Sequence, residues 1–411
     1  MLTMLKLFSK IVAFLDRYQN TIVHLMVFFL LVVGLGYSLY LGNVLTYPDA
    51  KQYYGIAQNI AAGNGITLDG VSPSSLLPPA VSCFWALLIK LGASITVLRY
   101  FNFIALALCL YVIRSILTTT GTKAGAPLAA ILIVGYPVLF YTAGTLYTQT
   151  LFMFLMLLII RVVVSVRFTY LHAILLGVLS ALLILTHSTG VFIPPLVVLW
   201  LVLPRNYSMI GKGVVAAFIA VICFTPWWYR NYVVFDRFIP LTSHGGDTLY
   251  MGNNPNTDLT AWYKYLEEDW FVEARKLSDE ELNAFYLRKT WEFWSQHTGD
   301  AVQLYGKKLL YHFKFRNNLH TSQENSSLKD VILFVTYYPL LLCLIGRLLF
   351  TFYVPLSRTE KLLVAIYIVS TFFHALFLPR LRFRLPYDAV LITHIGIMFS
   401  LAKERFLLAE E

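Results

Sequence analysis

Long apolar runs separated by short polar connections dominate the chain. Several reach the roughly 20 residues that a helix rising about 1.5 Å per residue needs to cross a bilayer core of about 30 Å. The pattern predicts an all-α polytopic membrane protein, built as one membrane domain over residues 1–411. The runs occupy residues 21–41, 79–93, 98–117, 126–141, 149–166, 170–186, 190–204, 213–229, 331–350, 360–378 and 385–402.

Basic residues in the connections indicate how many runs cross. Arginine and lysine favour the cytoplasmic side of a membrane. Lys6, Lys10 and Arg17 precede the first run. The basic connections lie on the same side of the membrane as these residues only if run 79–93 does not cross it. That run is the shortest and begins at Pro78-Pro79, so we expect a helix lying in the outer interface. About ten transmembrane helices remain, with both termini on the cytoplasmic side.

Composition supports a lipid environment and excludes several classes of function. Of the residues, 58% are hydrophobic and 13% charged, which is more apolar surface than a soluble core can bury. The net charge of +10 is spread over the connections, so it indicates topology and no nucleic-acid partner. No Walker loop or dinucleotide glycine fingerprint is present. The four cysteines lie singly in apolar runs, as small core residues do.

Three connections on the expected outer side are long or chemically unusual. They are a first outer loop at 42–97 with interfacial helices, a long outer loop at 230–328 with amphipathic helices, and a short turn at 379–384. Connecting segments carry binding and catalytic residues more often than the elements they join. We therefore look for function in these three.

The long outer loop shows helix signals of its own. Capping boxes are expected at Ser278 with Glu281 and at Asp300 with Gln303. The last helix, about 301–315, mixes lysines with large apolar residues and is expected to rest on the membrane surface. Its lysines are Lys307, Lys308 and Lys314.

An aspartate follows the first expected span, in the segment Tyr47-Pro48-Asp49-Ala50-Lys51-Gln52-Tyr53-Tyr54. A carboxylate at the membrane edge suits a general base that activates a hydroxyl acceptor. Spacing by itself favours a plainer interpretation of Asp49 as a helix cap or a solvated charge, since a helical stretch follows it.

Arginines are unusually frequent on the expected outer side. Arg380, Arg382 and Arg384 lie in the turn before the last span, and Arg99 and Arg230 lie at other outer span ends. Outer arginines at a membrane edge are uncommon unless an anion holds them. Guanidinium groups bind phosphate oxygens in pairs, so a lipid phosphate is the natural ligand. Contact with ordinary head groups is the alternative.

The signal for a metal is weak. His187 lies at an outer span end and could join Asp49, but no paired-ligand spacing surrounds it. Gln149, at another outer span end, carries an amide, which is a poor ligand for a divalent cation. We expect no cofactor and no metal, although a divalent metal stays open.

Taken in order, several segments resemble the GT-C superfamily of polyprenyl-phosphate-sugar glycosyltransferases, in particular the branch of aminoarabinose transferases and protein O-mannosyltransferases. The resemblance covers most of the chain, and no single segment carries it. The segments are Asp49 with the Tyr-Tyr and Ala57-Gln58-Asn59-Ile60 that follow, Pro78-Pro79, Pro226-Trp227 to Arg230-Asn231-Tyr232, the turns Gly245-Gly246 and Gly252-Asn253-Asn254-Pro255, and Arg382-Phe383-Arg384-Leu385-Pro386.

The resemblance implies an inverting glycosyltransferase with a GT-C-like fold. Asp49 would activate a hydroxyl acceptor, and Arg382 and Arg384 would meet the charge on the departing polyprenyl phosphate. Further substrate-binding residues would be Lys51, Tyr54, Arg99, Arg230 and Asn231. Relatives usually carry an acidic residue at Gln149, so metal-independent catalysis is expected here.

The resemblance also implies partners and a location. The donor would be a polyprenyl-phosphate sugar, the acceptor a lipid, glycan or protein hydroxyl, and membrane lipids would surround the protein. The location would be a bacterial plasma membrane, with the active site facing the periplasm or cell exterior. The alternatives are a transporter or flippase of lipid-linked sugars and a non-catalytic binding relative. Transporters more often carry ionisable residues in mid-span and internal repeats.

Overall fold

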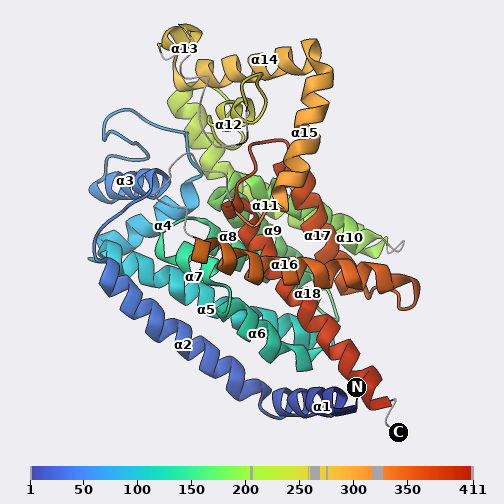
Figure 1. The fold of residues 1–411 in the computed structure, drawn as a ribbon. Coiled ribbons are helices and arrows are strands. Elements are labelled where there is room, and N and C mark those ends of the chain that lie inside the picture. The colour runs from blue at the N-terminus through green and yellow to red at the C-terminus, as the bar shows by residue number, and fades with distance from the viewer. Residues whose placement is uncertain are drawn as a thin grey trace.

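A computed structural model describes residues 2–203, 207–257, 259, 269–274, 276–316 and 327–408. Within these ranges the chain forms helices and no strand, apart from one isolated bridge between Thr67 and Pro73. The all-α membrane fold expected from the apolar runs is confirmed (Figure 1). The helices are α1 (Leu2–Arg17), α2 (Gln19–Leu41), α3 (Pro48–Ala62), α4 (Pro79–Lys90), α5 (Ile95–Thr119), η1 (Lys123–Gly125), α6 (Ala126–Val134), α7 (Pro137–Gly144), α8 (Gln149–Val163), α9 (Tyr170–Thr186), η2 (Ser188–Phe192), α10 (Ile193–Val202), α11 (Ser208–Phe235), α12 (Gly245–Met251), α13 (Asp269–Ala274), α14 (Asp279–Gln296), α15 (Thr298–His312), α16 (Ser327–Leu349), η5 (Phe350–Phe352), α17 (Arg358–His374) and α18 (Leu381–Leu408).

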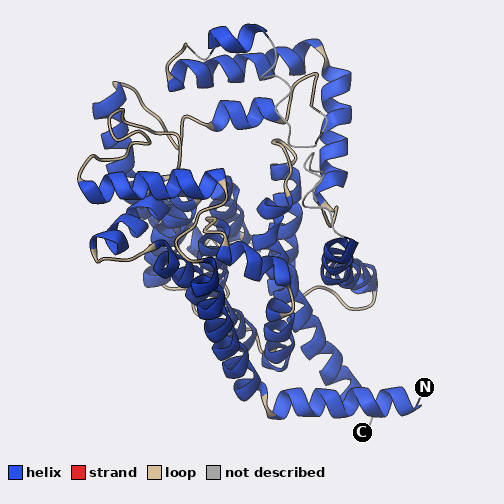
Figure 2. Cartoon of the chain, turned by 60° about the vertical axis from the view of Figure 1, so that its left-hand side comes forward, coloured by secondary structure: helices blue, strands red, loops and turns tan. Residues whose placement is uncertain are grey.

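The two ends of the helical bundle differ. Both chain termini lie at one end, where α1 runs across the bundle at a steep angle to α2 (Figures 1 and 2). At the other end lie α3, α4 and the helices of the long outer loop. The bundle therefore places the termini on one side and the expected functional loops on the other, as the charge pattern predicted.

Each expected span coincides with a helix, but many of these helices are short. Among the described residues, five helices are long and apolar enough to cross a membrane: α2, α5, α11, α16 together with η5, and α18. A sixth candidate is the pair α6 and α7, which is bent by 60° at Gly135-Tyr136. The other apolar helices are shorter, namely α4, α8, α9 and η2 with α10. Helix α4 begins at Pro79 and has 12 residues, too few to cross.

Helix α18 is the centre of the bundle. In its apolar window 72% of the residues are buried, compared with 17% in α11. Close backbone contact permits this burial: a Cβ added to Gly125 would lie 1.8 Å from the carbonyl oxygen of Gly396 on α18. Such an approach requires glycine. The central position of α18 fixes where its first residues emerge at the outer end.

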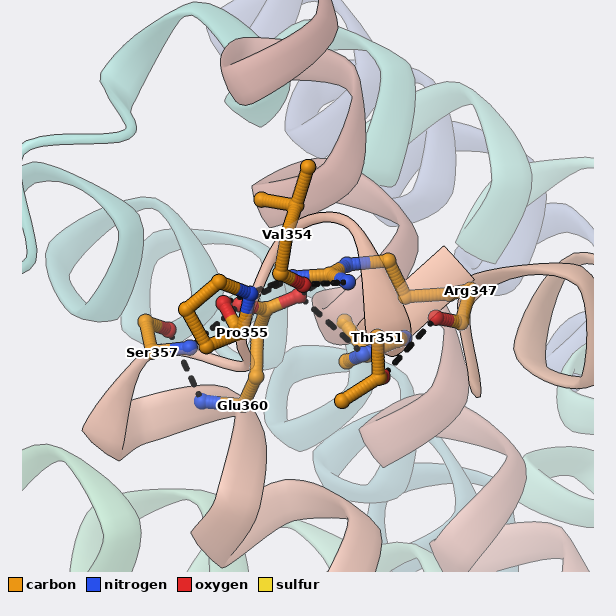
Figure 3. Close-up of polar contacts among 7 residues, drawn as sticks. Arg347, Thr351, Val354, Pro355, Ser357 and Glu360 are labelled. Carbon is orange, nitrogen blue, oxygen red and sulfur yellow. Dashed lines mark hydrogen bonds and ion pairs between the residues drawn. The ribbon is translucent and has the colours of Figure 1, made fainter. Parts of the chain in front are cut away.

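A buried ion pair closes the connection between α16 and α17 (Figure 3). Arg347 Nε lies 2.8 Å from Glu360 Oε1, and its other nitrogens donate to the carbonyls of Val354 and Pro355. Glu360 also accepts from the backbone N–H of Ser357, which caps α17. The guanidinium and carboxylate thus satisfy each other and the turn between them.

The long outer loop forms helices, with one difference from expectation. The capping box at Ser278 with Glu281 is confirmed, whereas α15 begins at Thr298, so Asp300 is no cap. Helix α15 runs from α14 down toward α17 and α18 (Figure 1). That this helix rests on the membrane surface stays a prediction. One of its lysines, Lys308, is fully buried and donates to the carbonyls of Gly252 and Leu376.

Candidate active site

The central feature is an ion pair between the first outer loop and the last helix. Asp49 lies in the first turn of α3, which Pro48 opens at its N-terminus. Arg382 lies in the first turn of α18. Arg382 Nη1 is 3.0 Å from Asp49 Oδ2, with the arginine side chain 20% and the aspartate 44% exposed. The structure thus brings together the carboxylate and one of the guanidinium groups that the sequence singled out.

Aromatic rings hold the Arg382 guanidinium in place. It lies 4.9 Å from the ring centre of Tyr147 and 5.1 Å from that of Phe383. Its Nε is buried and has no hydrogen-bond partner among the described residues. Leu146, directly before Tyr147, has a φ of 58°, a strained backbone for leucine. The ion pair with Asp49 therefore leaves the Nε–H donor of Arg382 without a partner among the described residues. The strained backbone at Leu146 positions the ring of Tyr147 beside this guanidinium.

Tyrosine side chains surround the carboxylate. Tyr53 is buried one helical turn after Asp49, and burial followed by the charge of Asp49 raises the pKa of its hydroxyl far above the ordinary value. Burial also raises the pKa of Tyr147. Both hydroxyls stay protonated and can donate. The sequence analysis did not assign Tyr53 or Tyr147 to the site. The four-residue spacing from Asp49 to Tyr53 places these two residues on one face of α3, which could have indicated Tyr53.

Two other expected residues of α3 stay predictions. Tyr54 is partly buried and packs against the apolar cluster of α3 and α4, of which Tyr53 is a buried member. Lys51 is exposed. The charges of Asp49 and Arg382 both act on the Tyr53 hydroxyl.

Arg99 does not reach the ion pair. Its guanidinium is buried and donates to three carbonyls, those of Gly144, Gly42 and Val44, at 2.6–2.7 Å. These carbonyls end α7 and follow α2, where helix geometry leaves acceptors unpaired. The expectation that Arg99 binds substrate is corrected: its donors are occupied by backbone.

Arg230 and Asn231 are also used within the fold. Arg230 donates to the carbonyls of Ser74 and Ile66 and to Asn231 Oδ1, so it attaches the first outer loop to α11. Asn231 is fully buried and donates to the carbonyl of Ile239. These hydrogen bonds give both side chains a role within the fold, and their contact with a substrate stays a prediction.

Arg384 is buried although it is two residues from Arg382. It pairs with Asp388 at 3.2 Å, donates to the carbonyls of His312 and Lys314, and lies 3.4 Å from the ring centre of Tyr337. Asp388 in turn accepts from Tyr136 at 2.7 Å. The guanidinium thus joins α15, α16 and α18, and the expectation that it binds a phosphate is corrected because its side chain is 1% exposed.

The residues near Asp49 do not fit a divalent cation. Its carboxylate contacts a guanidinium, which is itself a cation, and the described residues contain no group of three or more histidine, cysteine, aspartate or glutamate side chains able to hold a metal. His187 Nδ1 is 2.8 Å from Thr189 Oγ1, and its ring lies against Phe383. Gln149 is buried, and its Oε1 has no partner among the described residues.

Comparison with known proteins supports the fold. No model of a known protein family matches the sequence, and no curated protein sequence matches it significantly. The structure is similar to that of ArnT from Cupriavidus metallidurans bound to undecaprenyl phosphate, with a TM-score of 0.56, 12% sequence identity and coverage of 93% of this chain and 59% of ArnT. It is also similar to the oligosaccharyltransferase AglB from Archaeoglobus fulgidus, in complex with an inhibitory peptide and a dolichol-phosphate. There the TM-score is 0.51 and the identity 14%, with 92% of this chain and 50% of AglB covered.

The chain therefore shares the fold of these two proteins, as the resemblance of its segments to the GT-C superfamily led us to expect. It spans 59% of the length of ArnT and 50% of that of AglB. Both similarities identify the fold only. The chemistry of this chain has to be argued from its own residues.

Proposed function

We propose that this protein is an inverting glycosyltransferase that moves a sugar from a polyprenyl-phosphate donor to a hydroxyl acceptor on a lipid, glycan or protein. The observation that carries the proposal is the contact of Asp49 with Arg382 at the loop-bearing end of the bundle. A base and an anion-binding group 3.0 Å apart suit a reaction in which a proton is removed while a phosphate leaves. We place this end at the outer face of a bacterial plasma membrane.

The reaction would proceed in one displacement. Asp49 takes the proton of the acceptor hydroxyl as its oxygen attacks the anomeric carbon from the face opposite the phosphate. A new glycosidic C–O bond forms as the anomeric C–O bond to the phosphate breaks. The electron pair leaves with the polyprenyl phosphate, whose charge Arg382 meets. No step requires a metal, and none is assigned to one.

The same contact explains how the donor would prepare the base. Without a substrate the guanidinium neutralises Asp49. The donor phosphate is a diester, with one negative charge and two non-bridging oxygens as in a carboxylate, but it gains charge as the anomeric bond breaks, so it would draw Arg382 away through charge-assisted hydrogen bonds. Asp49 would then be free to accept a proton. Tyr53 and Tyr147 stay protonated and can hydrogen-bond the sugar or phosphate.

The test is to incubate the purified protein with a panel of polyprenyl-phosphate sugars and to measure which one is consumed. The Asp49→Asn variant should bind the consumed donor but lose turnover by a factor of about 10² to 10⁴, the usual contribution of a general base. Asp69→Asn is the matched control, because Asp69 lies in the same loop and its Oδ1 accepts from Val71 and Ser72, which asparagine can also do. Undiminished turnover in Asp49→Asn would refute the proposal.

The same variant separates a transferase from a flippase of lipid-linked sugars. A flippase needs no base, so Asp49→Asn should still move a labelled lipid-linked sugar across vesicle membranes. Transfer of the sugar by the wild type with loss in the variant, and no translocation by either, supports the transferase.

A further inference from the structure

A small cleft lies beside the active site, where the end of α15 meets the start of α18. Its enclosed volume is about 10 Å³, and the cleft opens to solvent. Its walls come from the C-terminal end of α15 and from the turn that precedes Arg382. The lining residues are Tyr311, His312, Lys314, Arg316, Pro379, Arg380 and Leu381.

The cleft is cationic. Arg316 pairs with Asp330 of α16, which neutralises one of its three cations. Lys314 lies 4.9 Å from the ring centre of Tyr311, and the polar contact of Arg380 is Met251 Sδ at 3.8 Å. Neither Lys314 nor Arg380 has an ion pair with another described residue. Two positive charges from different parts of the chain thus share one cleft, and no carboxylate of the described residues pairs with either.

His312, one of the lining residues, carries a buried polar atom. His312 is 5% exposed, and its Nε2 has no hydrogen-bond partner among the described residues. Burial and neighbouring charges keep its pKa well below the ordinary value, so the imidazole is neutral and can donate one hydrogen bond. Buried polar atoms without partners are uncommon in folded proteins.

This cleft is separate from the Asp49–Arg382 pair. Arg380 contacts Met251 of α12, whereas Arg382, two residues later, contacts Asp49 of α3. The turn before α18 therefore presents guanidinium groups to two different places.

The surroundings favour a lipid. Asp330, which holds Arg316 at the rim, lies in the first turn of α16. Along the next turns α16 exposes apolar side chains that have room for acyl chains beside a head group in the cleft. They are Leu328, Val331, Phe334 and Val335, which are 71%, 56%, 49% and 58% exposed.

We propose that this cleft is a second anion site, which binds the phosphate group of a membrane lipid through Lys314 and Arg380 while the lipid chains lie on α16. Such a site lets the protein hold a phosphate-bearing lipid next to the transfer site without occupying Arg382. The proposal concerns binding, so it can hold or fail whatever reaction the protein catalyses.

The test measures lipid binding to the full chain in a neutral detergent. Dioleoyl phosphatidic acid is titrated into the wild type and detected by native mass spectrometry, with dioleoylglycerol and inorganic phosphate in parallel arms. The variant Lys314→Gln/Arg380→Gln should bind phosphatidic acid at least tenfold more weakly. The matched control Arg358→Gln/Lys361→Gln removes two charges from the first turn of α17 and should bind as the wild type does.

Each other outcome overturns the proposal. Equal weakening in both double variants would show unspecific attraction to net charge. Binding of inorganic phosphate as tight as that of phosphatidic acid would make the site one for free phosphate and remove the lipid. Unchanged affinity in the cleft variant would remove the site. If that variant does not fold, Arg380→Gln with Lys314 intact should still weaken binding, with size-exclusion chromatography as the check on folding.

Discussion

Arg382 Nη1 lies 3.0 Å from Asp49 Oδ2, although one residue opens the last helix and the other follows the first span. Because Asp49 is 44% exposed, the pair is largely solvated, and exposed pairs of this kind contribute only about 0 to 1 kcal/mol. The contact is therefore weak enough for a substrate phosphate to replace. The position of this contact depends on α18, because the buried residues of that helix fix the position of Arg382 at its N-terminal end.

We expect Arg382→Gln to abolish most turnover with little effect on folding. Removing a donor that meets developing negative charge costs a factor of about 10² to 10³ in kcat. The double variant Asp49→Asn/Arg382→Gln should lose less than the product of the single losses, because groups that act together are not additive. Turnover is followed as release of polyprenyl phosphate.

The control for this pair is Arg237→Gln, an exposed arginine after α11 whose guanidinium contacts one backbone carbonyl. It should keep wild-type turnover. Fully multiplicative losses in the double variant would mean that Asp49 and Arg382 act independently, contrary to the mechanism proposed for them.

The sequence predicted the helices well because apolar runs and their breaks are local signals. Proline located the start of α4, and the loops carried Asp49 and Arg382, whereas the bend between α6 and α7 lies inside a run that was expected to be one span. Sequence could not tell which arginines meet an anion. Arg99 and Arg384 lie at span ends as Arg382 does, but the fold brings unpaired carbonyls to the first and Asp388 to the second. These partners are distant in sequence, so no local pattern reveals them.

Lys308 should make the outer helices more stable as pH rises above neutrality. Its ammonium is buried, donates to Gly252 O at 2.9 Å and Asn253 Oδ1 at 2.8 Å, and burial lowers its pKa to about 7 from 10.5. Between these two values the unfolded chain binds a proton that the folded chain does not. The free energy of unfolding therefore rises with pH in this window, by at most about 1.4 kcal/mol per unit, and the penalty is fully present below pH 7.

The measurement is hydrogen exchange of α14 and α15 between pH 6.5 and 9.5, corrected for the intrinsic exchange rate. Lys308→Met removes the titrating group and should remove most of the slope, whereas Lys307→Met, at an exposed neighbouring position, should retain it. An identical slope in Lys308→Met would assign the pH dependence to another group.

Removing one partner of the Arg347–Glu360 pair should lower the stability of the protein more than replacing both partners with uncharged residues. Both side chains are buried, at 7% and 0% exposure. Glu360→Gln leaves the guanidinium without its counter-charge, and such losses cost about 3 to 5 kcal/mol. Arg347→Met/Glu360→Gln removes both charges and should recover a large part of this. Thermal unfolding in detergent measures both, and a double variant less stable than either single one would contradict the expectation.

A variant of Arg99 can distinguish an arginine that stabilises the fold from one that binds the substrate. Arg99→Gln removes donors from the carbonyls of Gly144, Gly42 and Val44, and each buried acceptor left unpaired costs about 1 to 3 kcal/mol. We expect a marked fall in the thermal unfolding midpoint, with an unchanged KM for the donor in the fraction that folds. Arg114→Gln on the same helix loses one contact, to Asn20, and should unfold close to the wild type. If Arg99 bound the donor phosphate, the pattern would reverse: Arg99→Gln would stay stable and lose donor affinity, as expected for a group that faces a ligand rather than backbone.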